Sequence, residues 1–103
     1  MIPKNIPIRD RKYLDYLRTQ PCIVTGHRTT DYEGVDPAHI GTAGKSLKSG
    51  DDEALPLSHT IHDECHRRGE MTVLREKLPN NVLRAALRAL AREGYREWRN
   101  ENG

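Results

Sequence analysis

Hydrophobic residues recur at helical spacing in three parts of the chain, and caps indicate a fourth helix. Between residues 10 and 19 the apolar face is formed by Tyr13, Leu14 and Leu17, and Asp10 is placed to cap a short amphipathic helix. A second helix is predicted to start after a cap at Ser58 and to end at Gly69. A short third helix, ending before Pro79, carries Met71, Leu74 and Leu78. The longest helix follows a cap at Asn80 or Asn81, has the apolar stripe Leu83, Ala86, Leu87 and Leu90, and is weakened at Gly94.

Short extended segments lie between these helices. Residues 22–26 (CIVTG) are typical of a strand that runs into a turn, and residues 35–40 (VDPAHI) predict a second strand, which Pro37 restricts to an edge or a bulge. Residues 41–52 are predicted to form a loop, and Ala54 to Leu57 return the chain to the core. The pattern therefore predicts an α+β fold.

The composition limits the size of the core. The chain has 103 residues, of which 35% are hydrophobic and 31% charged, and it contains no Phe. This predicts one small domain that needs a metal or a partner for stability. No apolar run is long enough to cross a membrane, and the N-terminus lacks a secretory signal. With only two cysteines, Cys22 and Cys65, we expect a soluble, cytoplasmic protein without a disulfide framework.

Charge is unevenly distributed along the chain. Residues 1–66 contain eight Lys/Arg and ten Asp/Glu, whereas residues 67–103 contain nine and five, so the net charges are −2 and +4. All five histidines lie in the first part. Such an arrangement is typical of a cation site next to a surface that binds a polyanion.

The histidines indicate the chemistry. His62 and His66 are spaced i, i+4, which places two imidazoles about 6 Å apart on one face of a helix, where they can bind one divalent metal. A solvated helix face is the alternative explanation of this spacing. The context favours a metal, because His39 ends a predicted strand that is followed by a loop, a strand and the histidine helix. In this ββα-metal plan a neutral histidine deprotonates water opposite the metal.

Several motifs together resemble those of the phage and prophage HNH nucleases related to the recombination enhancement function (Ref) nuclease. They are Pro21-Cys22 after the first helix, Ala38-His39-Ile40, Lys48 with Asp51, Pro56-Leu57-Ser58, and His62 to Gly69, and the resemblance spans residues 12–70. It implies that His39 is the general base and that His62 and His66 bind the metal. It places Asp51 or Asp52 at the central polar position of the catalytic set, and Asp36 is a candidate carboxylate near the metal. Each aspartate has the alternative role of a turn former or helix cap.

Two departures from this family concern its metal sites. Of the structural zinc ligands that many members carry, only Cys22 is present, and Thr25, Ser58 and Ile61 occupy the other positions. We therefore expect this zinc to be lost, with a rebuilt site from Cys22, His27, His59 or Cys65 as the alternative. In addition, Ala38 stands before the general base, where many HNH enzymes place a metal ligand.

Basic residues near the predicted metal site are the candidates for DNA binding. They are Lys45, Lys48, Arg67 and Arg68, joined by Arg84 and Arg88 from a ridge that continues through Arg92, Arg96 and Arg99 on the last helix. The alternative is a solvated ridge that pairs with Glu93 and Glu97. No motif that reads bases is present, so we expect little sequence specificity.

The sequence thus predicts a single HNH nuclease domain, with an arm (1–9), a ββα-metal core (10–69) and C-terminal helices (70–103). The expected activity is hydrolysis of DNA phosphodiester bonds in a bacterial host cell, with Mg²⁺ or Mn²⁺ as the working metal and Zn²⁺ as another occupant. A recombinase or another phage protein is an expected partner. The alternative is a non-catalytic HNH module that binds DNA or zinc in a phage recombination or packaging assembly. A metalloprotease is disfavoured because Asp63, and not Glu, immediately follows His62.

Overall fold

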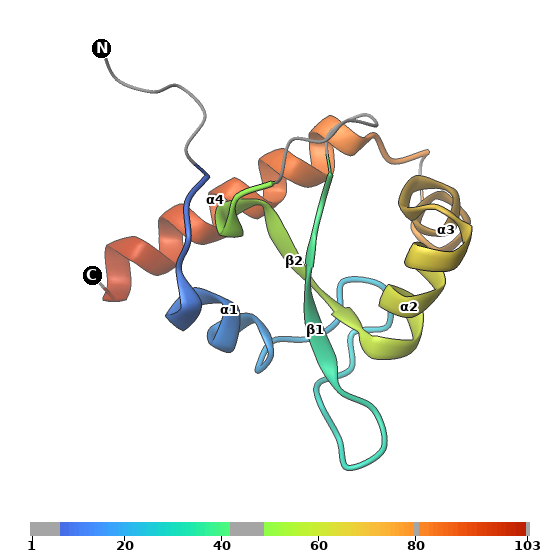
Figure 1. Cartoon of the computed structure of the whole chain (residues 1–103), viewed down its shortest axis with the longest axis horizontal. Coiled ribbons are helices and arrows are strands. Elements are labelled where there is room, and N and C mark those ends of the chain that lie inside the picture. Colours follow the sequence, from blue (N-terminus) through green and yellow to red (C-terminus); the bar gives the residue numbers. More distant parts are fainter. Residues whose placement is uncertain (1–6, 42–48, 80, 103) are drawn as a thin grey trace.

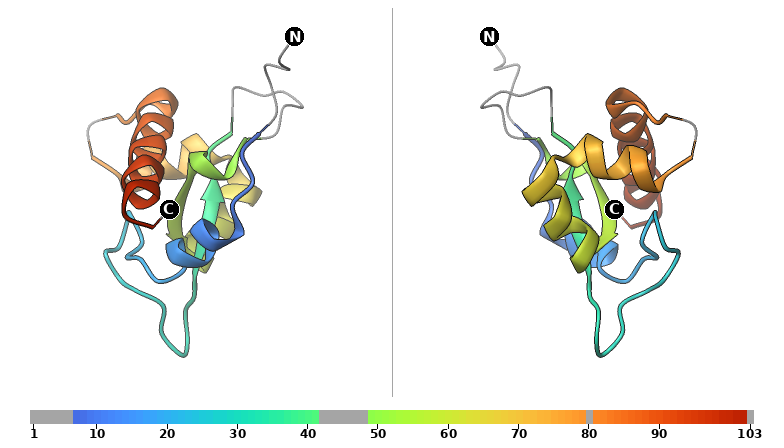
Figure 2. Two further views of the ribbon diagram at one scale, coloured as in Figure 1. Left: turned by 90° about the vertical axis from the view of Figure 1, so that its left-hand side faces the viewer. Right: turned by 90° about the vertical axis from the view of Figure 1, so that its right-hand side faces the viewer.

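A two-stranded antiparallel sheet lies at the centre of the fold, between helices on two sides. The computed structural model describes residues 7–41, 49–79 and 81–102. Its elements are, in order, α1 (Arg11–Leu17), β1 (Val35–His39), the 3-10 helix η1 (Asp51–Glu53), β2 (Ala54–Ser58), α2 (His59–Arg68), α3 (Glu70–Lys77) and α4 (Arg84–Asn102). Figure 1 shows α4 on one side of the strands and the α2–α3 pair on the other. In the right-hand view of Figure 2, α2 and α3 come forward and α4 lies behind them. The predicted α+β class is confirmed.

The register of the sheet explains how two prolines fit into it. Pro37 of β1 lies opposite Pro56 of β2. The flanking interstrand hydrogen bonds are made by Ile40 N to Glu53 O, at 2.9 Å, and by His59 N to Gly34 O, at 2.8 Å. Since hydrogen-bonded positions alternate in an antiparallel pair, both prolines occupy positions whose N–H would point away from the partner strand. Neither proline therefore removes a bond from the ladder.

The N-termini of α1 and α2 are stabilised by carboxylates. Asp10 caps α1 as predicted, since its side chain accepts a hydrogen bond from Tyr13 N at 3.1 Å. Ser58 occupies the N-cap position of α2, but its side chain makes no capping bond. Glu33 replaces it by accepting from the N–H and the hydroxyl of Thr60, at 2.8 and 3.0 Å. Glu33, 27 residues before Thr60, thus makes the capping bond that was predicted for Ser58.

The apolar face of α4 differs from the prediction. Leu87 and Ala91 are buried, whereas Leu83 and Leu90 are 61% and 55% exposed. The helix is turned so that Tyr95 and Trp98 pack against α1 and two of its arginines reach an acidic residue of η1. It starts at Arg84, after Asn81 with φ +45°, while Asn80 lies outside the described residues. It also continues through Gly94, where a Cβ would lie 3.4 Å from the Tyr13 hydroxyl.

The strand predicted at residues 22–26 is wrong, because this segment forms a turn. Cys22 N donates to His27 O at 2.9 Å, and Gly26 N donates to Cys22 O at 2.8 Å. Gly26 has φ +76°, a conformation that glycine adopts without strain and that lets the chain reverse. Ile23 N of this turn bonds to β2, at 3.0 Å from Pro56 O, while the N–H groups of Cys22 and Gly26 are used within the turn.

Buried side chains form two clusters. The larger joins the sheet to α2, α3 and α4, and its fully buried members include Ile40, Leu57, Val73 and Leu74. The smaller contains Tyr13, Leu17 and Ala54, with Tyr95 and Trp98 packed against it, and joins α1 to α4. No helix in the described ranges is long and apolar enough to span a membrane.

Candidate active site

His39, the last residue of β1, is hydrogen-bonded to Asp51, the first residue of η1. Their Nε2 and Oδ1 atoms are 2.9 Å apart. The Asp51 side chain is only 7% exposed, and its second oxygen accepts a hydrogen bond from Asp10 N at 2.7 Å. Asp51 N in turn donates to Ile8 O at 2.8 Å. Asp51 is therefore the aspartate, of the two predicted, that contacts His39.

The protonation of Asp51 fixes the role of each ring nitrogen of His39. Burial raises the pKa of the Asp51 carboxyl, but the hydrogen bonds from His39 and the Asp10 N–H outweigh it, so this pKa lies below its usual value. An ionised carboxylate can only accept, so Nε2 of His39 carries the proton. In the neutral ring the lone pair is then on Nδ1, the atom that can accept a proton from water.

His62 and His66 lie one turn apart on α2, with their ring planes tilted by 45°. Their ring centroids are 4.7 Å apart. His62 Nδ1 lies 3.0 Å from Asp36 Oδ2 on β1, and His59 Nδ1 lies 2.8 Å from the same oxygen. Asp36 thus orients the first histidine of the pair and leaves its Nε2 free. Carboxylates hold metal-binding histidines in this way.

Hydrogen bonding at Asp36 also changes two pKa values. Burial raises the pKa of the Asp36 carboxyl, but the hydrogen bonds from His62 and His59 more than compensate, and the pKa is lowered. The same contact raises the pKa of His59, whose ring is largely exposed. Asp36 is therefore ionised at neutral pH and accepts from both rings.

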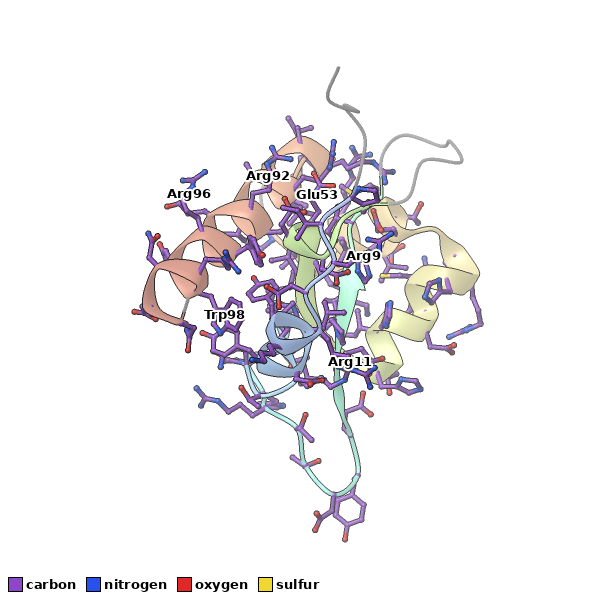
Figure 3. The ribbon with its side chains drawn as sticks, turned by 60° about the vertical axis from the view of Figure 1, so that its left-hand side comes forward. Arg9, Arg11, Glu53, Arg92, Arg96 and Trp98 are labelled. Atoms are coloured by element: carbon purple, nitrogen blue, oxygen red, sulfur yellow. The ribbon has the colours of Figure 1, made fainter. Side chains whose placement is uncertain are left out.

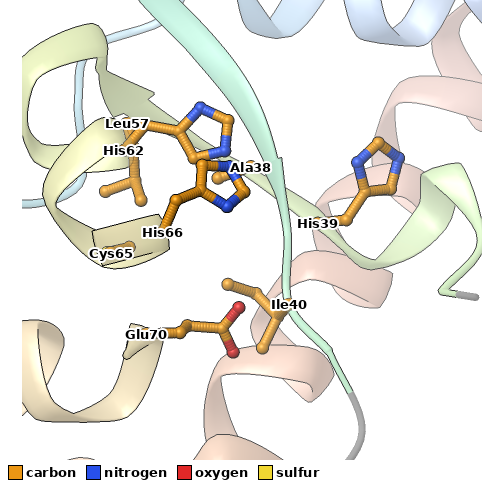
Figure 4. Close-up of a pocket in the computed structure, with 8 residues that line it drawn as sticks. All are labelled: Ala38, His39, Ile40, Leu57, His62, Cys65, His66 and Glu70. Carbon is orange, nitrogen blue, oxygen red and sulfur yellow. The ribbon is translucent and has the colours of Figure 1, made fainter. Parts of the chain in front are cut away.

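The three histidines singled out by the sequence line one pocket. The lining consists of His39, His62, His66 and Glu70 together with Ala38, Ile40, Leu57 and Cys65. In Figure 4 the rings of His62 and His66 lie next to each other on one side of β1, and His39 extends from the other side of the strand. The pocket lining thus includes both kinds of site residue predicted by the sequence, although His39 projects from the side of β1 opposite to the two α2 imidazoles.

Glu70 is the pocket residue that the sequence reasoning missed. Its carboxylate accepts from Arg84 at 2.9 Å and from Gly41 N at 3.3 Å. The signal was its spacing, since Glu70 follows His66 by four residues, as His66 follows His62. Gly69, with φ +98°, ends α2 between them and hides this relation from a search for one continuous helix.

The donor set of the pocket fits a divalent metal in part. Across the described residues, no three His, Cys, Asp or Glu side chains are already grouped as a metal site. The pair His62 and His66 nevertheless offers two imidazoles, one of them oriented by Asp36. Imidazole nitrogens suit Zn²⁺ and related transition metals, and water completes the coordination in open sites.

The described arginines predicted to bind DNA all make ion pairs within the chain. Arg67 pairs with Asp63, and Arg68 pairs with Glu64 and Glu76. Arg84 pairs with Glu70, and Arg88 with Glu53. On the α4 ridge, Arg96 pairs with Glu93, and Arg92 joins Arg88 in pairing with Glu53. Lys45 and Lys48 lie outside the described residues.

Cys22 lies where the family resemblance expects a structural zinc. Burial raises the pKa of its thiol, but hydrogen bonds from backbone N–H groups, including those of Thr25 and Ser58, outweigh it and lower the pKa. The sulfur is 3.4 Å from Val24 N. Cys22 and Cys65 are both buried and free. The alternative of a rebuilt zinc site finds no three-ligand group among the residues that the structure describes.

Comparison with known families places the chain in one of them. A family model described as a protein of unknown function, DUF968, matches residues 1–72. The chain belongs to the DUF968 family. The match contains Asp36, His39, Asp51, His62 and His66 and stops before α4. Comparisons with curated proteins and with solved structures gave no match.

Proposed function

We propose that this protein is a metal-dependent endonuclease of the HNH, or ββα-metal, type, which hydrolyses phosphodiester bonds in DNA. The observation that carries the proposal is the pocket lined by His39, His62 and His66. Asp51 holds the ring of His39, and Asp36 holds the ring of His62. The order of β1, β2 and α2 and the resemblance of residues 12–70 to phage and prophage nucleases support it.

Each side chain has a defined task in this proposal. His39 accepts a proton from the attacking water at Nδ1, while Asp51 holds its Nε2–H and favours the positive charge that develops on the ring. His62 and His66 would hold Mg²⁺ or Mn²⁺, with Zn²⁺ as another occupant, and Asp36 orients His62. A metal bound there supplies positive charge that stabilises the pentacovalent phosphorus and the leaving oxygen.

The test is cleavage of supercoiled plasmid by purified protein with Mg²⁺, Mn²⁺ or Zn²⁺. We expect metal-dependent nicking by the wild type and a loss on the order of 10²- to 10⁴-fold in His39→Ala, because a general base contributes about this factor. His27→Ala is the matched control, since His27 is exposed and does not line the pocket. No nicking by the wild type, or full activity of His39→Ala, would contradict the proposal.

A second candidate is a non-catalytic module that binds DNA or zinc in a phage recombination or packaging assembly. Ala38, which lines the pocket and offers no ligand, favours this reading, as does the lack of a ready three-ligand group in the described parts of the chain. The module would retard DNA in a gel shift and leave plasmid intact with every metal. A recombinase or phage-protein partner is a separate prediction, tested by whether such a protein changes the rate of nicking.

A further inference from the structure

The helix α4 contacts the segment that precedes α1, which in turn holds Asp51. Tyr95 on α4 donates its hydroxyl hydrogen to Asp10 Oδ2 at 3.0 Å. The backbone N–H of Asp10 donates to Asp51 Oδ2 at 2.7 Å. Two hydrogen bonds that meet at Asp10, one to its side chain and one from its backbone, therefore link α4 to the carboxylate that holds His39. Tyr95 and Asp10 are 85 positions apart in sequence.

A second contact joins α4 to η1, the element that carries Asp51. Arg88 and Arg92 both donate to Glu53 Oε2, at 2.6 and 2.7 Å. Figure 3 shows Glu53 on η1 close to Arg92 of α4. The backbone carbonyl of Glu53 accepts from the N–H of Ile40, the residue after His39, at 2.9 Å. Glu53 therefore ties α4 to η1 through its side chain and to the end of β1 through its backbone.

These contacts are placed to be stronger than ordinary surface pairs. The Glu53 side chain is 11% exposed, and the Arg88 and Arg92 side chains are 28% and 44% exposed. Charge pairs shielded from water are less screened, and removing one partner leaves the other charge unpaired. By contrast, the Arg96 and Glu93 side chains of the surface pair on the same helix are 67% and 53% exposed. Movement of α4 would thus be transmitted to Asp10, which donates to Asp51, and to Glu53, which lies in η1 with Asp51.

We propose that α4 is a positioning element for the His39–Asp51 pair, acting through Tyr95 on Asp10 and through Arg88 and Arg92 on Glu53. For catalysis this rests on the proposed nuclease function. The part of the chain that matches the DUF968 family ends at residue 72, so the site within that part is completed by a helix beyond the match. A helix that only covered the core, with Leu87 and Ala91 buried beneath it, would need none of these polar contacts.

Two conservative variants and two matched controls test this inference. Tyr95→Phe removes one hydroxyl and keeps the ring. Tyr16→Phe is its control, because the Tyr16 ring also packs against Tyr13 but is 39% exposed. Arg92→Gln breaks a contact with Glu53, and Arg96→Gln is its control on the helix surface. The readouts are the ¹⁵N shifts of the His39 ring, which report the Nε2–H tautomer, and the kcat and KM of DNA cleavage.

We expect Tyr95→Phe and Arg92→Gln to lower the population of the Nε2–H tautomer and to reduce kcat on the order of tenfold with KM unchanged, because misplacement of a reacting group lowers the rate of the chemical step. The controls should match the wild type in every readout. Unchanged His39 shifts in both variants, even with lower thermal stability, would overturn the inference, because a helix that only covers the core predicts that result. If the wild type cleaves no DNA, the proposed function fails while the NMR shifts still decide the positioning role.

Discussion

His39 and Asp51 are 12 residues apart in sequence, and their side chains are joined by a hydrogen bond of 2.9 Å. Both Asp51 oxygens are used, because the second accepts from Asp10 N. Asp51 therefore serves two hydrogen-bond donors, and the Arg9 guanidinium lies 3.8 Å from its Oδ1.

The first prediction ranks substitutions of this residue. Asp51→Asn offers one acceptor to two donors, so we expect DNA cleavage to fall on the order of tenfold, and Asp51→Ala, which offers none, to lose about a hundredfold. Initial rates of plasmid nicking at saturating metal measure this order. Asp52→Asn is the control, since Asp51 and not Asp52 is the carboxylate that is hydrogen-bonded to His39. Equal loss in the Asp52 variant would contradict the assignment of Asp51.

The second prediction concerns Asp36 and the metal. Without its carboxylate, His62 loses the acceptor for Nδ1–H and with it a fixed ring orientation. We expect Asp36→Ala to weaken Mn²⁺ or Zn²⁺ binding about 10- to 100-fold, as loss of an outer-shell partner does at other metal sites. Calorimetric titration with each metal gives the affinity. Asp63→Ala is the control, because Asp63 lies on α2 next to His62 and is paired with Arg67, and this variant should bind metal like the wild type. Equal affinities for the two variants would refute the role of Asp36.

The third prediction is a loss of stability at alkaline pH caused by Tyr13. Burial is the main cause that raises the pKa of Tyr13 from 10.0 to about 12, and this side chain is only 2% exposed. The folded state thus holds its proton more tightly than the unfolded state. The free energy of unfolding should fall as the pH rises from 10 to 12 and level off above, by about 2 to 3 kcal/mol in all, at 1.36 kcal/mol per pKa unit.

Urea unfolding at pH 9 and at pH 11.5 measures this change. Tyr13→Phe should lose most of the pH dependence, since it has no proton to release, whereas Tyr16→Phe should keep it. An alkaline loss of the same size in Tyr13→Phe would show that another group is responsible.

The fourth prediction concerns the close packing next to Asp51. A Cβ on Gly50 would lie 2.5 Å from Asp52 Oδ1 and 2.9 Å from Ile8 N, too close for either to remain in place. We expect Gly50→Ala to destabilise the fold by about 1 to 3 kcal/mol, as overpacking does elsewhere. Each kcal/mol should lower Tm by about 4 to 8 °C in a domain of this size.

Gly34→Ala provides the comparison, because a Cβ there would meet nothing within 4 Å. Thermal unfolding of both variants, followed by circular dichroism, measures the difference. If Gly50→Ala and Gly34→Ala have the same Tm, the tight approach of residue 50 to the segment around Ile8 does not exist in solution.

Local sequence signals predicted the elements that local chemistry determines. Asp10 before an apolar repeat predicted α1, and Gly69 after the histidines predicted the end of α2, because each signal satisfies its own helix terminus. The adjacent rings of His62 and His66 followed from helical spacing alone. The family resemblance offered Asp51 or Asp52 as the central polar residue, and neither the resemblance nor the spacing specified the hydrogen bond between His39 and Asp51.

Contacts between distant segments could not be predicted in this way. The rotation of α4 depends on Arg88 and Arg92 reaching Glu53, 35 and 39 residues earlier in the chain, and no periodic pattern encodes such a pair. The apolar stripe predicted that Leu83 and Leu90 lie in the core, but both are exposed. The turn at residues 22–26 was missed for another reason, because Gly26 reverses a segment whose composition favours a strand.

The opposed prolines of the sheet have a consequence for how the molecule behaves among its own copies. At Pro37 and Pro56 each outer border of the ribbon lacks an N–H donor, and on the β2 side the Pro56 carbonyl is already bonded to Ile23 N at 3.0 Å. An incoming strand from another chain would find a gap in the row of groups it must match. A ribbon of only two strands is thereby kept from growing by edge-to-edge addition, which guards a small protein against fibrous self-association.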